Sequence, residues 1–275
     1  MMIDILLSTY NGATYLEEQL SSIRSQSFTD WHLFVRDDGS ADATLTILHQ
    51  WQQLLPDRMT ILSESEHLGT VRSFERLLQQ ASAPYVAFAD QDDIWLPDKL
   101  LHSMRYMDQA EQDMGKETPL LICGDLAVVD SEGKIVDSSF YHYARLNVDW
   151  LSSPERLAVC NYVSGATMLM NRSAIRLALP LSPAAWVHDA AMALQILQGG
   201  GTIIRTAFTD VHYRQHEANV IGAHPTRGCG YYLSKILFPW HVLIRQHRNY
   251  RQAHAITGMN RYRYIRNRVT YLLKR

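Results

Sequence analysis

The sequence has no acidic residue after Glu217, although 26 lysines and arginines nearly balance 28 aspartates and glutamates over the whole chain. The residues after Glu217 include two lysines and nine arginines, which leaves 15 basic residues against all 28 acidic ones before them. The tail is therefore formally +11 and the rest of the chain −13. This split predicts an added basic surface for anionic partners, and no nucleic-acid-binding motif accompanies it.

Cysteines are few, and long hydrophobic runs are absent. The three cysteines, Cys123, Cys160 and Cys229, share no spacing typical of metal ligands or redox pairs, so we expect free thiols in a reducing compartment. The apolar segment 3–7 is short and is interrupted by Asp4, so it does not resemble a signal peptide. No run reaches the roughly 18 apolar residues that a membrane span needs.

A glycine-rich phosphate-binding loop is also missing. No Gly-x-Gly-x-x-Gly pattern follows the first predicted strand, which argues against a dinucleotide-dependent dehydrogenase. What the first hundred residues do contain is an alternation of strand and helix signals. Apolar runs bounded by turn residues predict strands at 3–8, 31–35, 59–62 and 85–89. Amphipathic patterns predict helices around 15–23, 42–53 and 69–80.

Strands separated by helices imply parallel βαβ units, so we expect an α/β fold with a mostly parallel central sheet. The following residues mix the two signals less regularly. Strand patterns occur at 120–130, 162–170, 202–207 and 210–214, and a helical pattern at 189–198. We expect this second part of the chain to complete the sheet and to bind a second substrate.

Three polar loops follow predicted strands of the first half. They are 8–11, 37–40 and 90–93. In open α/β sheets, ligands bind beyond the carboxyl ends of the strands. The three loops should therefore lie at one edge of the sheet and form one site.

Asp90 and Asp92 form the candidate metal site. Residues at i and i+2 that leave a strand point to the same side. Two carboxylates there suit Mg²⁺ or Mn²⁺, which prefer oxygen ligands and leave positions for phosphate oxygens. The alternative is an acidic turn in which Asp93 caps the next helix. The position on the same edge as two other polar loops favours the metal.

The loop after the second strand is a candidate nucleoside site. The carboxylate of Asp38 can accept hydrogen bonds from a base N–H or a ribose hydroxyl, and Gly39 permits close backbone approach. In the first loop, the ring of Tyr10 can stack on a base. For both loops, a plain strand-to-helix turn is the alternative.

Three segments carry a resemblance to a known family. They read STYNG at 8–12, DDGS at 37–40 and FADQDDIW at 88–95. Together they resemble family-2 glycosyltransferases with the GT-A fold, over about residues 2–222. The DQDDIW form, with Lys99 after it, is similar to bacterial rhamnosyltransferases of surface-polysaccharide assembly. The sequence departs from the usual pattern at His67 and Ser73, where asparagine is common.

The resemblance implies roles for individual residues. It assigns the donor nucleotide to Thr9, Tyr10, Asn11, Glu17, Asp38, Asp90 and Arg214. It assigns Mg²⁺ or Mn²⁺ to Asp90, Asp92 and His216. It assigns the acceptor to Trp95, Gly165 and His188. For His216, a phosphate donor or a structural histidine remains an alternative, and for Gly165 a bulge or close strand packing.

The resemblance also implies a catalytic carboxylate late in the domain, which here is Asp189 in the pair His188-Asp189. A carboxylate aimed at the acceptor hydroxyl can act as general base, worth about 10²–10⁴ in rate. The alternative role for Asp189 is the N-cap of the helix that follows. The two roles are compatible, since a helix start positions a side chain rigidly.

The implied activity is an inverting sugar transfer from a nucleoside diphosphate donor. The resemblance favours L-rhamnose from dTDP-rhamnose, with a dTDP- or UDP-sugar as the donor class and a glycan or polyprenyl-diphosphate-linked glycan as acceptor. Two alternatives stay open. One is a sugar-1-phosphate nucleotidyltransferase, although segment 8–15 is not a glycine-rich loop. The other is a non-catalytic glycan-binding subunit.

The predicted organisation is one GT-A domain over 1–222, with a nucleotide-binding half at 1–100 and an acceptor half at 101–222. The remaining residues, 223–275, are predicted to form a basic, aromatic-rich helical tail. Basic residues near an anionic surface contribute on the order of 1 kcal/mol each, and interfacial aromatic side chains add anchoring. We therefore expect a cytoplasmic protein, peripheral at the inner membrane. A solvated helix pair or an oligomer contact is the alternative.

Overall fold

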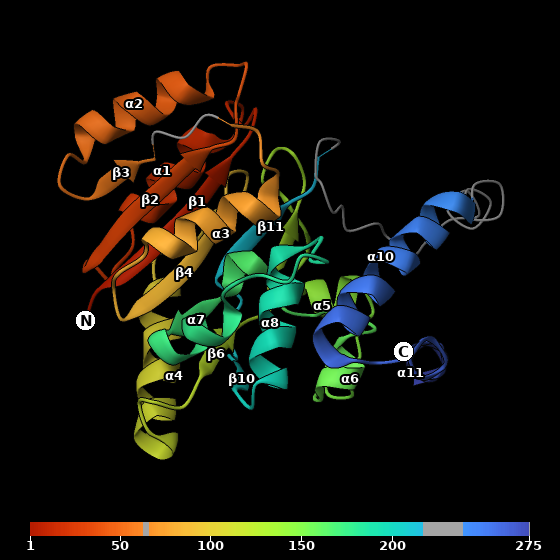
Figure 1. The fold of residues 1–275 in the computed structure, drawn as a ribbon. Coiled ribbons are helices and arrows are strands. Elements are labelled where there is room, and N and C mark those ends of the chain that lie inside the picture. The colour runs from red at the N-terminus through yellow and green to blue at the C-terminus, as the bar shows by residue number, and fades with distance from the viewer. Residues whose placement is uncertain (63–65, 217–238, 275) are drawn as a thin grey trace.

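The computed structural model describes residues 1–62, 66–216 and 239–274. Two sheets form its centre (Figure 1). The larger has the strand order β10-β6-β9-β4-β1-β2-β3, and the smaller β5-β11-β7-β8. The larger sheet consists of β1 (Ile3–Thr9), β2 (Trp31–Asp37), β3 (Met59–Ile61), β4 (Tyr85–Asp90), β6 (Leu120–Cys123), β9 (Leu169–Asn171) and β10 (Thr202–Arg205). The smaller consists of β5 (Ile94–Trp95), β7 (Ala127–Val129), β8 (Ile135–Asp137) and β11 (Val211–Arg214).

Helices cover both faces of the large sheet. The helices of the described residues are α1 (Leu16–Arg24), α2 (Thr44–Leu54), α3 (Thr70–Gln80), α4 (Lys99–Met114), α5 (Phe140–Tyr143), α6 (Pro154–Leu157), α7 (Arg172–Ala178), α8 (His188–Gln198), α10 (Pro239–Thr257) and α11 (Arg261–Lys274). Of these, α5 packs on the small sheet, and α10 packs on α8. Successive side chains of β4 point to opposite faces of the sheet, so the core has two parts. Ala87 belongs to the part with α1, α2 and α4, and Phe88 to the part with α3 and α8. The large sheet is therefore buried on both faces, as its continuous apolar strands require.

Strand β1 occupies the centre of the predicted parallel sheet. It pairs with β2 and with β4, both in parallel, and the register sets Thr9 opposite Asp37 and Ser8 opposite Asp90. The three strands therefore end at the same level. The prediction that their polar loops share one edge of the sheet is confirmed.

The prediction of a single strand at 120–130 is wrong. Strand β6 ends at Cys123 and belongs to the large sheet, whereas β7 begins at Ala127 in the small sheet. The chain turns between them, where a Cβ on Gly124 would lie 2.7 Å from the Thr206 hydroxyl oxygen. The carboxylate of Asp125 also accepts the Tyr141 N–H. Close packing and this polar turn interrupt an apolar run that looks continuous in sequence.

The prediction of a strand at 162–170 is also largely wrong. A short 3₁₀ turn, Gly165–Thr167, precedes β9, and only Leu169–Asn171 forms a strand. That strand pairs antiparallel with both β4 and β6. Together with β6 and β10 it completes the large sheet, as we expected of the second half.

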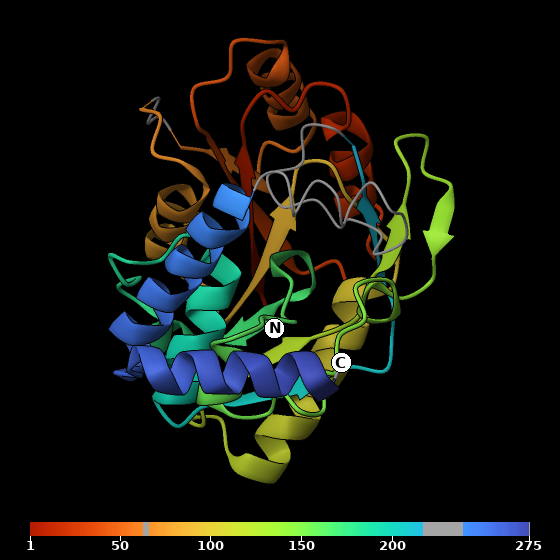
Figure 2. The same cartoon turned by 90° about the vertical axis from the view of Figure 1, so that its right-hand side faces the viewer.

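The C-terminal helices pack onto the α/β body. Figure 2 shows α11 lying along the outside of the molecule, with α10 rising from one of its ends. Buried side chains of this segment, including Met259, Tyr264 and Tyr271, join the same core cluster as α3 and α8. The predicted boundary at 222 and 223 lies outside the described residues. None of the helices described here is long and apolar enough to cross a membrane.

The outcome for the cysteines is partial. Cys123 is a buried free thiol and Cys160 a half-buried one, in agreement with the expectation of free thiols. Cys229 lies outside the described residues.

Candidate active site

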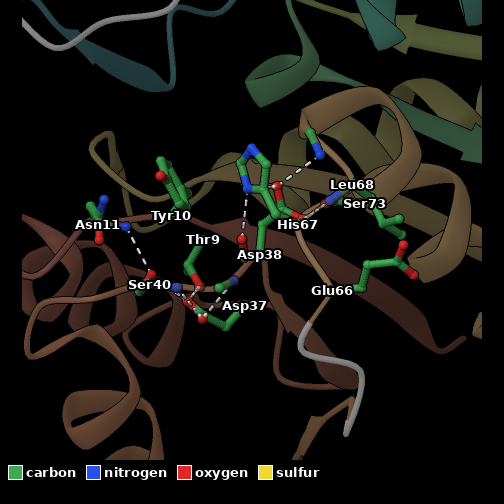
Figure 3. A network of polar contacts seen from close by, with 12 residues as sticks. Thr9, Tyr10, Asn11, Asp37, Asp38, Ser40, Glu66, His67, Leu68 and Ser73 are labelled. Carbon is green, nitrogen blue, oxygen red and sulfur yellow. Dashed lines mark hydrogen bonds and ion pairs between the residues drawn. The ribbon is translucent and has the colours of Figure 1, made fainter.

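The loop after β2 uses its two carboxylates to build its own structure (Figure 3). Asp37 accepts the Thr9 hydroxyl at 2.8 Å and the N–H groups of Gly39 and Ser40 at 3.1 and 2.8 Å. Gly39 has φ 87°, a conformation that glycine adopts without strain. Thr9 and Asp37 therefore tie the first loop to the second and shape the turn.

Asp38, predicted to contact the nucleoside, points its carboxylate into the protein. It is 3% exposed and accepts hydrogen bonds from Arg36 at 2.5 Å and from the N–H groups of Leu68 and Gly69 at 2.7 and 2.8 Å. Burial by itself would raise the pKa of Asp38, but the hydrogen bonds from Leu68, Arg36, Gly69 and Ser73 outweigh it and hold that pKa below its ordinary value. In this arrangement Asp38 fixes the segment that carries His67.

Two rings stand above this network. Tyr10 is 49% exposed, and its ring centroid lies 4.9 Å from that of His67. The His67 ring is held by its Nδ1, 2.9 Å from the carbonyl oxygen of Asp38. Figure 3 shows both rings on the same side of the loop. Their planes are tilted by 48° to each other, so a base can stack on one ring with the edge of the other beside it.

The first loop is also fastened to the acidic loop. The Tyr10 N–H donates to the Gln91 side-chain oxygen at 2.8 Å, and the Gln91 amide donates to the Tyr10 carbonyl at 3.1 Å. A Cβ on Gly12 would lie 2.3 Å from that Gln91 oxygen, so a larger residue there would displace the Gln91 side chain from Tyr10. Asn11 joins the second loop, because its N–H donates to the Ser40 hydroxyl at 2.8 Å. Glu17 does not join these loops by this contact. Its carboxylate accepts the indole N–H of Trp51, which lies on α2, at 2.6 Å.

The acidic loop after β4 has the opposite electrostatics. Burial raises the pKa of Asp90 to about 7, and the negative charges of Asp92 and Asp189 add to this shift. Asp93 is fully buried, and its pKa is also raised by burial and by the neighbouring carboxylates. One of its oxygens accepts the Arg214 N–H at 3.2 Å. Among the residues that the structure describes, none forms an ion pair with Asp90.

His216 and Arg214 close this side of the site. The His216 Nε2 lies 2.7 Å from a carboxylate oxygen of Asp92. The guanidinium of Arg214 is 2% exposed, donates to the carbonyls of Asp92 and Ser131 at 3.1 and 3.0 Å, and forms an ion pair with Glu18. Arg214 was predicted to contact the donor phosphates. Its guanidinium is instead hydrogen-bonded to protein groups, among them the carbonyl of Asp92 in the acidic loop.

The predicted ligands Asp90, Asp92 and His216 do not form a ready three-ligand cluster. Within the described residues, no three histidine, cysteine or acidic side chains converge in a geometry that could hold a metal ion. The donor set nonetheless fits a divalent cation, because burial and then the charges of Asp92 and Asp189 raise the pKa of Asp90, and a bound cation would favour the ionised carboxylates. A bound diphosphate would supply the missing oxygen ligands.

Asp189 lies on the same side of the sheet as the acidic loop, although 99 positions separate it from Asp90 in the sequence. Its carboxylate accepts the Gly165 N–H at 3.1 Å and the Asn161 amide at 3.2 Å, as well as the Ala190 N–H. Burial raises its pKa to about 6, and the two N–H groups limit the shift. The N-cap alternative is wrong, because the capping residue of α8 is Val187.

The predicted acceptor residues are less open than expected. Trp95 is 2% exposed, and the Lys99 ammonium lies 3.6 Å from its ring centroid, so the indole does not face a substrate in this arrangement. His188 is 6% exposed and stacks on Phe74 with centroids 4.1 Å apart. Burial lowers the pKa of His188 to about 3, so the ring is neutral. A Cβ on Gly165 would lie 2.7 Å from His188 Nε2, which explains glycine there by close packing.

The sequence did not reveal that the C-terminal helices hold the segment before Asp189. The Trp186 N–H donates to the Gln252 side chain at 3.1 Å, and its indole N–H to that of Asn249 at 3.0 Å. Both partners lie on α10, more than sixty positions away. Since isolated polar residues on a helix give no signal of such a contact, only the tertiary structure identifies it.

Comparisons with known proteins find similarity in sequence and in fold. Residues 4–115 match the model of the family described as Glycosyl transferase family 2. The dTDP-rhamnosyl transferase RfbG of Shigella flexneri is 38% identical over 102 residues, which span 36% of this chain and 35% of the relative. This chain spans less than half the length of this and of two further curated relatives, TuaG and EpsH of Bacillus subtilis.

Solved structures resemble the chain over almost its whole length. The crystal structure of Staphylococcus aureus TarS 1-349 in complex with UDP-GlcNAc has a TM-score of 0.62 at 18% identity and covers 99% of this chain and 72% of its own. The mannosyltransferase PcManGT from Pyrobaculum calidifontis, in complex with GDP-Man and Mn²⁺, has a TM-score of 0.58 at 18% identity, covering 99% and 74%. The chain therefore has the GT-A fold, and its residues 4–115 match the Glycosyl transferase family 2 model.

Proposed function

We propose that this chain is a metal-dependent glycosyltransferase that transfers a sugar, with inversion, from a nucleoside diphosphate to an acceptor hydroxyl. One observation carries the proposal. The turn Gly165–Thr167 packs against β4, whose last residue is Asp90, and the Gly165 N–H donates to the Asp189 carboxylate at 3.1 Å, so the candidate base lies beside the strand that leads into the candidate metal loop. A transferase needs both groups within reach of the same anomeric carbon.

Each residue has a defined task in this reaction. Tyr10 and His67 stack on the donor base, while Thr9, Asn11 and Asp37 keep their loops in register. Asp90 and Asp92, with His216 beside Asp92, would hold Mg²⁺ or Mn²⁺. When bound, this ion neutralises charge on the departing diphosphate.

Asp189 takes the proton of the acceptor hydroxyl as that oxygen attacks C1 of the sugar from the face opposite the diphosphate. The hydrogen bonds from Gly165 and Asn161 orient its carboxylate. Its raised pKa, about 6, makes it a better proton acceptor than an ordinary aspartate while it stays ionised at neutral pH.

We propose dTDP-L-rhamnose as the donor, with a UDP-sugar as the broader class. The support is the name of the relative RfbG, a dTDP-rhamnosyl transferase, and the UDP-GlcNAc bound in the TarS structure. The proposed acceptor is a glycan, free or linked to a polyprenyl diphosphate at the cytoplasmic face of the inner membrane. The charge of the tail, +11 after Glu217, supports this location.

A thermal-shift screen of nucleotide sugars with Mn²⁺ tests the donor. A ligand that binds only the folded state raises the melting temperature, so dTDP- or UDP-sugars should raise it and EDTA should abolish the shift. The Asp189→Asn variant should keep the shift and lose about 10²–10⁴ in transfer rate. No metal-dependent response to any nucleotide sugar would contradict the proposal.

The screen should be paired with an assay for the alternative reaction. A nucleotidyltransferase would release diphosphate from a nucleoside triphosphate mixed with a sugar 1-phosphate. We expect no diphosphate in that mixture. Diphosphate release that Asp90→Asn abolishes would replace the proposed transfer with this alternative.

A further inference from the structure

Helix α11 has one face buried against the body of the protein. Tyr264 and Tyr271 are buried and lie seven residues apart, two helical turns, so they point to the same side. On this side Arg268 donates to the Val159 carbonyl at 2.6 Å, and Arg263 forms an ion pair with Glu155 at 2.5 Å. The position of the helix is therefore fixed by specific contacts.

The opposite face of α11 is a stripe of exposed apolar side chains. Five of them are between 50% and 83% exposed: Tyr262, Ile265, Val269, Leu272 and Leu273. Their spacing of three and four residues aligns them along one side of the helix. Figure 2 shows α11 at the surface over its whole length. Helices that serve only as solvated surface carry polar residues there, so this stripe indicates contact with an apolar partner.

The charges around the stripe are all of one sign. Helix α11 contains four arginines and Lys274, and no acidic residue. On the helical wheel Arg261 and Arg266 border the stripe on its two sides. Within the part of the chain that the structure describes, neither of them forms an ion pair. Both are exposed. Their charges are available to a partner.

We propose that the exposed face of α11 docks on an anionic lipid surface. The apolar stripe, defined by the five residues above, enters the boundary between head groups and acyl chains, and the bordering arginines contact lipid phosphates. A second copy of the chain fits less well, because two such helices face to face would bring Arg261 and Arg266 of both copies, four like charges, together. This inference sharpens the membrane location proposed above but does not depend on the identity of the sugar.

Sedimentation of the full-length chain with vesicles tests the docking face. We expect binding to vesicles of phosphatidylglycerol mixed with phosphatidylcholine, weaker binding to phosphatidylcholine alone, and weakening as salt rises. Val269→Glu should reduce partition to the anionic vesicles by at least about tenfold. It places a negative charge in the apolar stripe, and the lipid surface is also negative. Val136→Glu on strand β8 is the matched control, because Val136 is similarly exposed at 54% and should bind as the unaltered chain does.

Three measurements keep this test separate from the proposed activity. Circular-dichroism melting should be unchanged in Val269→Glu, because the substituted side chain is exposed. Sugar transfer to a soluble acceptor without vesicles should also be unchanged. Equal vesicle binding by the two variants would overturn the docking face whatever the activity. So would a dimer in solution that Val269→Glu dissociates, since a second copy would then occupy the stripe.

Discussion

Two acidic loops leave the parallel strands on either side of β1, and the protein treats their charges in opposite ways. After β2, hydrogen bonds from Leu68, Arg36 and Gly69 outweigh burial and lower the pKa of Asp38. After β4, burial and the charges of Asp92 and Asp189 raise the pKa of Asp90 to about 7. The first loop has the counter-charge of Arg36, whereas in the second loop burial and the neighbouring carboxylates outweigh the lowering effect of Arg214 and keep the pKa of Asp93 raised. We infer that the carboxylate of Asp38 in the first loop stabilises the fold, whereas the carboxylate of Asp90 in the second loop is available for the reaction.

The sharpest test of this contrast removes charge from the second loop. Asp90→Asn keeps the side-chain shape and relieves repulsion, so the melting temperature in EDTA should stay constant or rise. Transfer should nevertheless fall by about 10²–10⁴, because a metal at a leaving group supplies several kcal/mol and each 1.36 kcal/mol is tenfold in rate. Initial-rate assays and thermal melts on the same preparation check both parts. A marked loss of stability with modest loss of rate would make this loop structural.

The reciprocal change in the first loop should act on stability. Asp38→Asn leaves the fully buried Arg36 without its carboxylate, which costs roughly 3–5 kcal/mol. Urea unfolding measures it as a lower midpoint. The double variant Arg36→Met with Asp38→Asn should recover part of the loss, because no buried charge is then unpaired. If Asp38→Asn unfolds at the wild-type midpoint, the internal ion pair contributes nothing.

The smallest effect concerns pH. Asp189 must be ionised to accept a proton, and its pKa is raised to about 6, so kcat/KM should fall tenfold per unit as the pH drops below about 6. With Mn²⁺ at saturation, which keeps Asp90 ionised, the profile should be flat between that pH and the optimum. Asp189→Asn should lack this inflection while Asp38→Asn, scaled for its folded fraction, should retain it. A profile with its acid limb near pH 4 in the unaltered chain would count against Asp189 as the base.

Sequence patterns predicted the parallel half of the fold well. Strands β1, β2 and β4 are apolar, bounded by turn residues and separated by amphipathic helices, so local signals fix their type and order. They failed at 120–130, where the chain passes from the large sheet to the small one, and at 162–170, where only the last two residues belong to a strand. A segment that passes from one sheet to another stays largely apolar. Its composition therefore does not show where it stops pairing with strands of the first sheet and begins pairing with strands of the second.

The candidate site divides in the same way. The sequence by itself determined that acidic and polar loops meet at the carboxyl edge of a parallel sheet, because strand direction and spacing suffice for that conclusion. It did not determine which carboxylates are hydrogen-bonded or ion-paired to other groups of the protein. Arg36 reaches Asp38 two residues away, but Leu68, Gly69 and Ser73 arrive from a distant helix start.

Only the tertiary structure decided three further matters: Trp95 and His188 are packed inside, α10 holds Trp186, and Asp189 shares a site with Asp90. The physical reason is common to all three. Burial, desolvation and charge proximity depend on residues far apart in the chain, and these quantities decide whether a side chain is free to react or is already occupied in holding the fold.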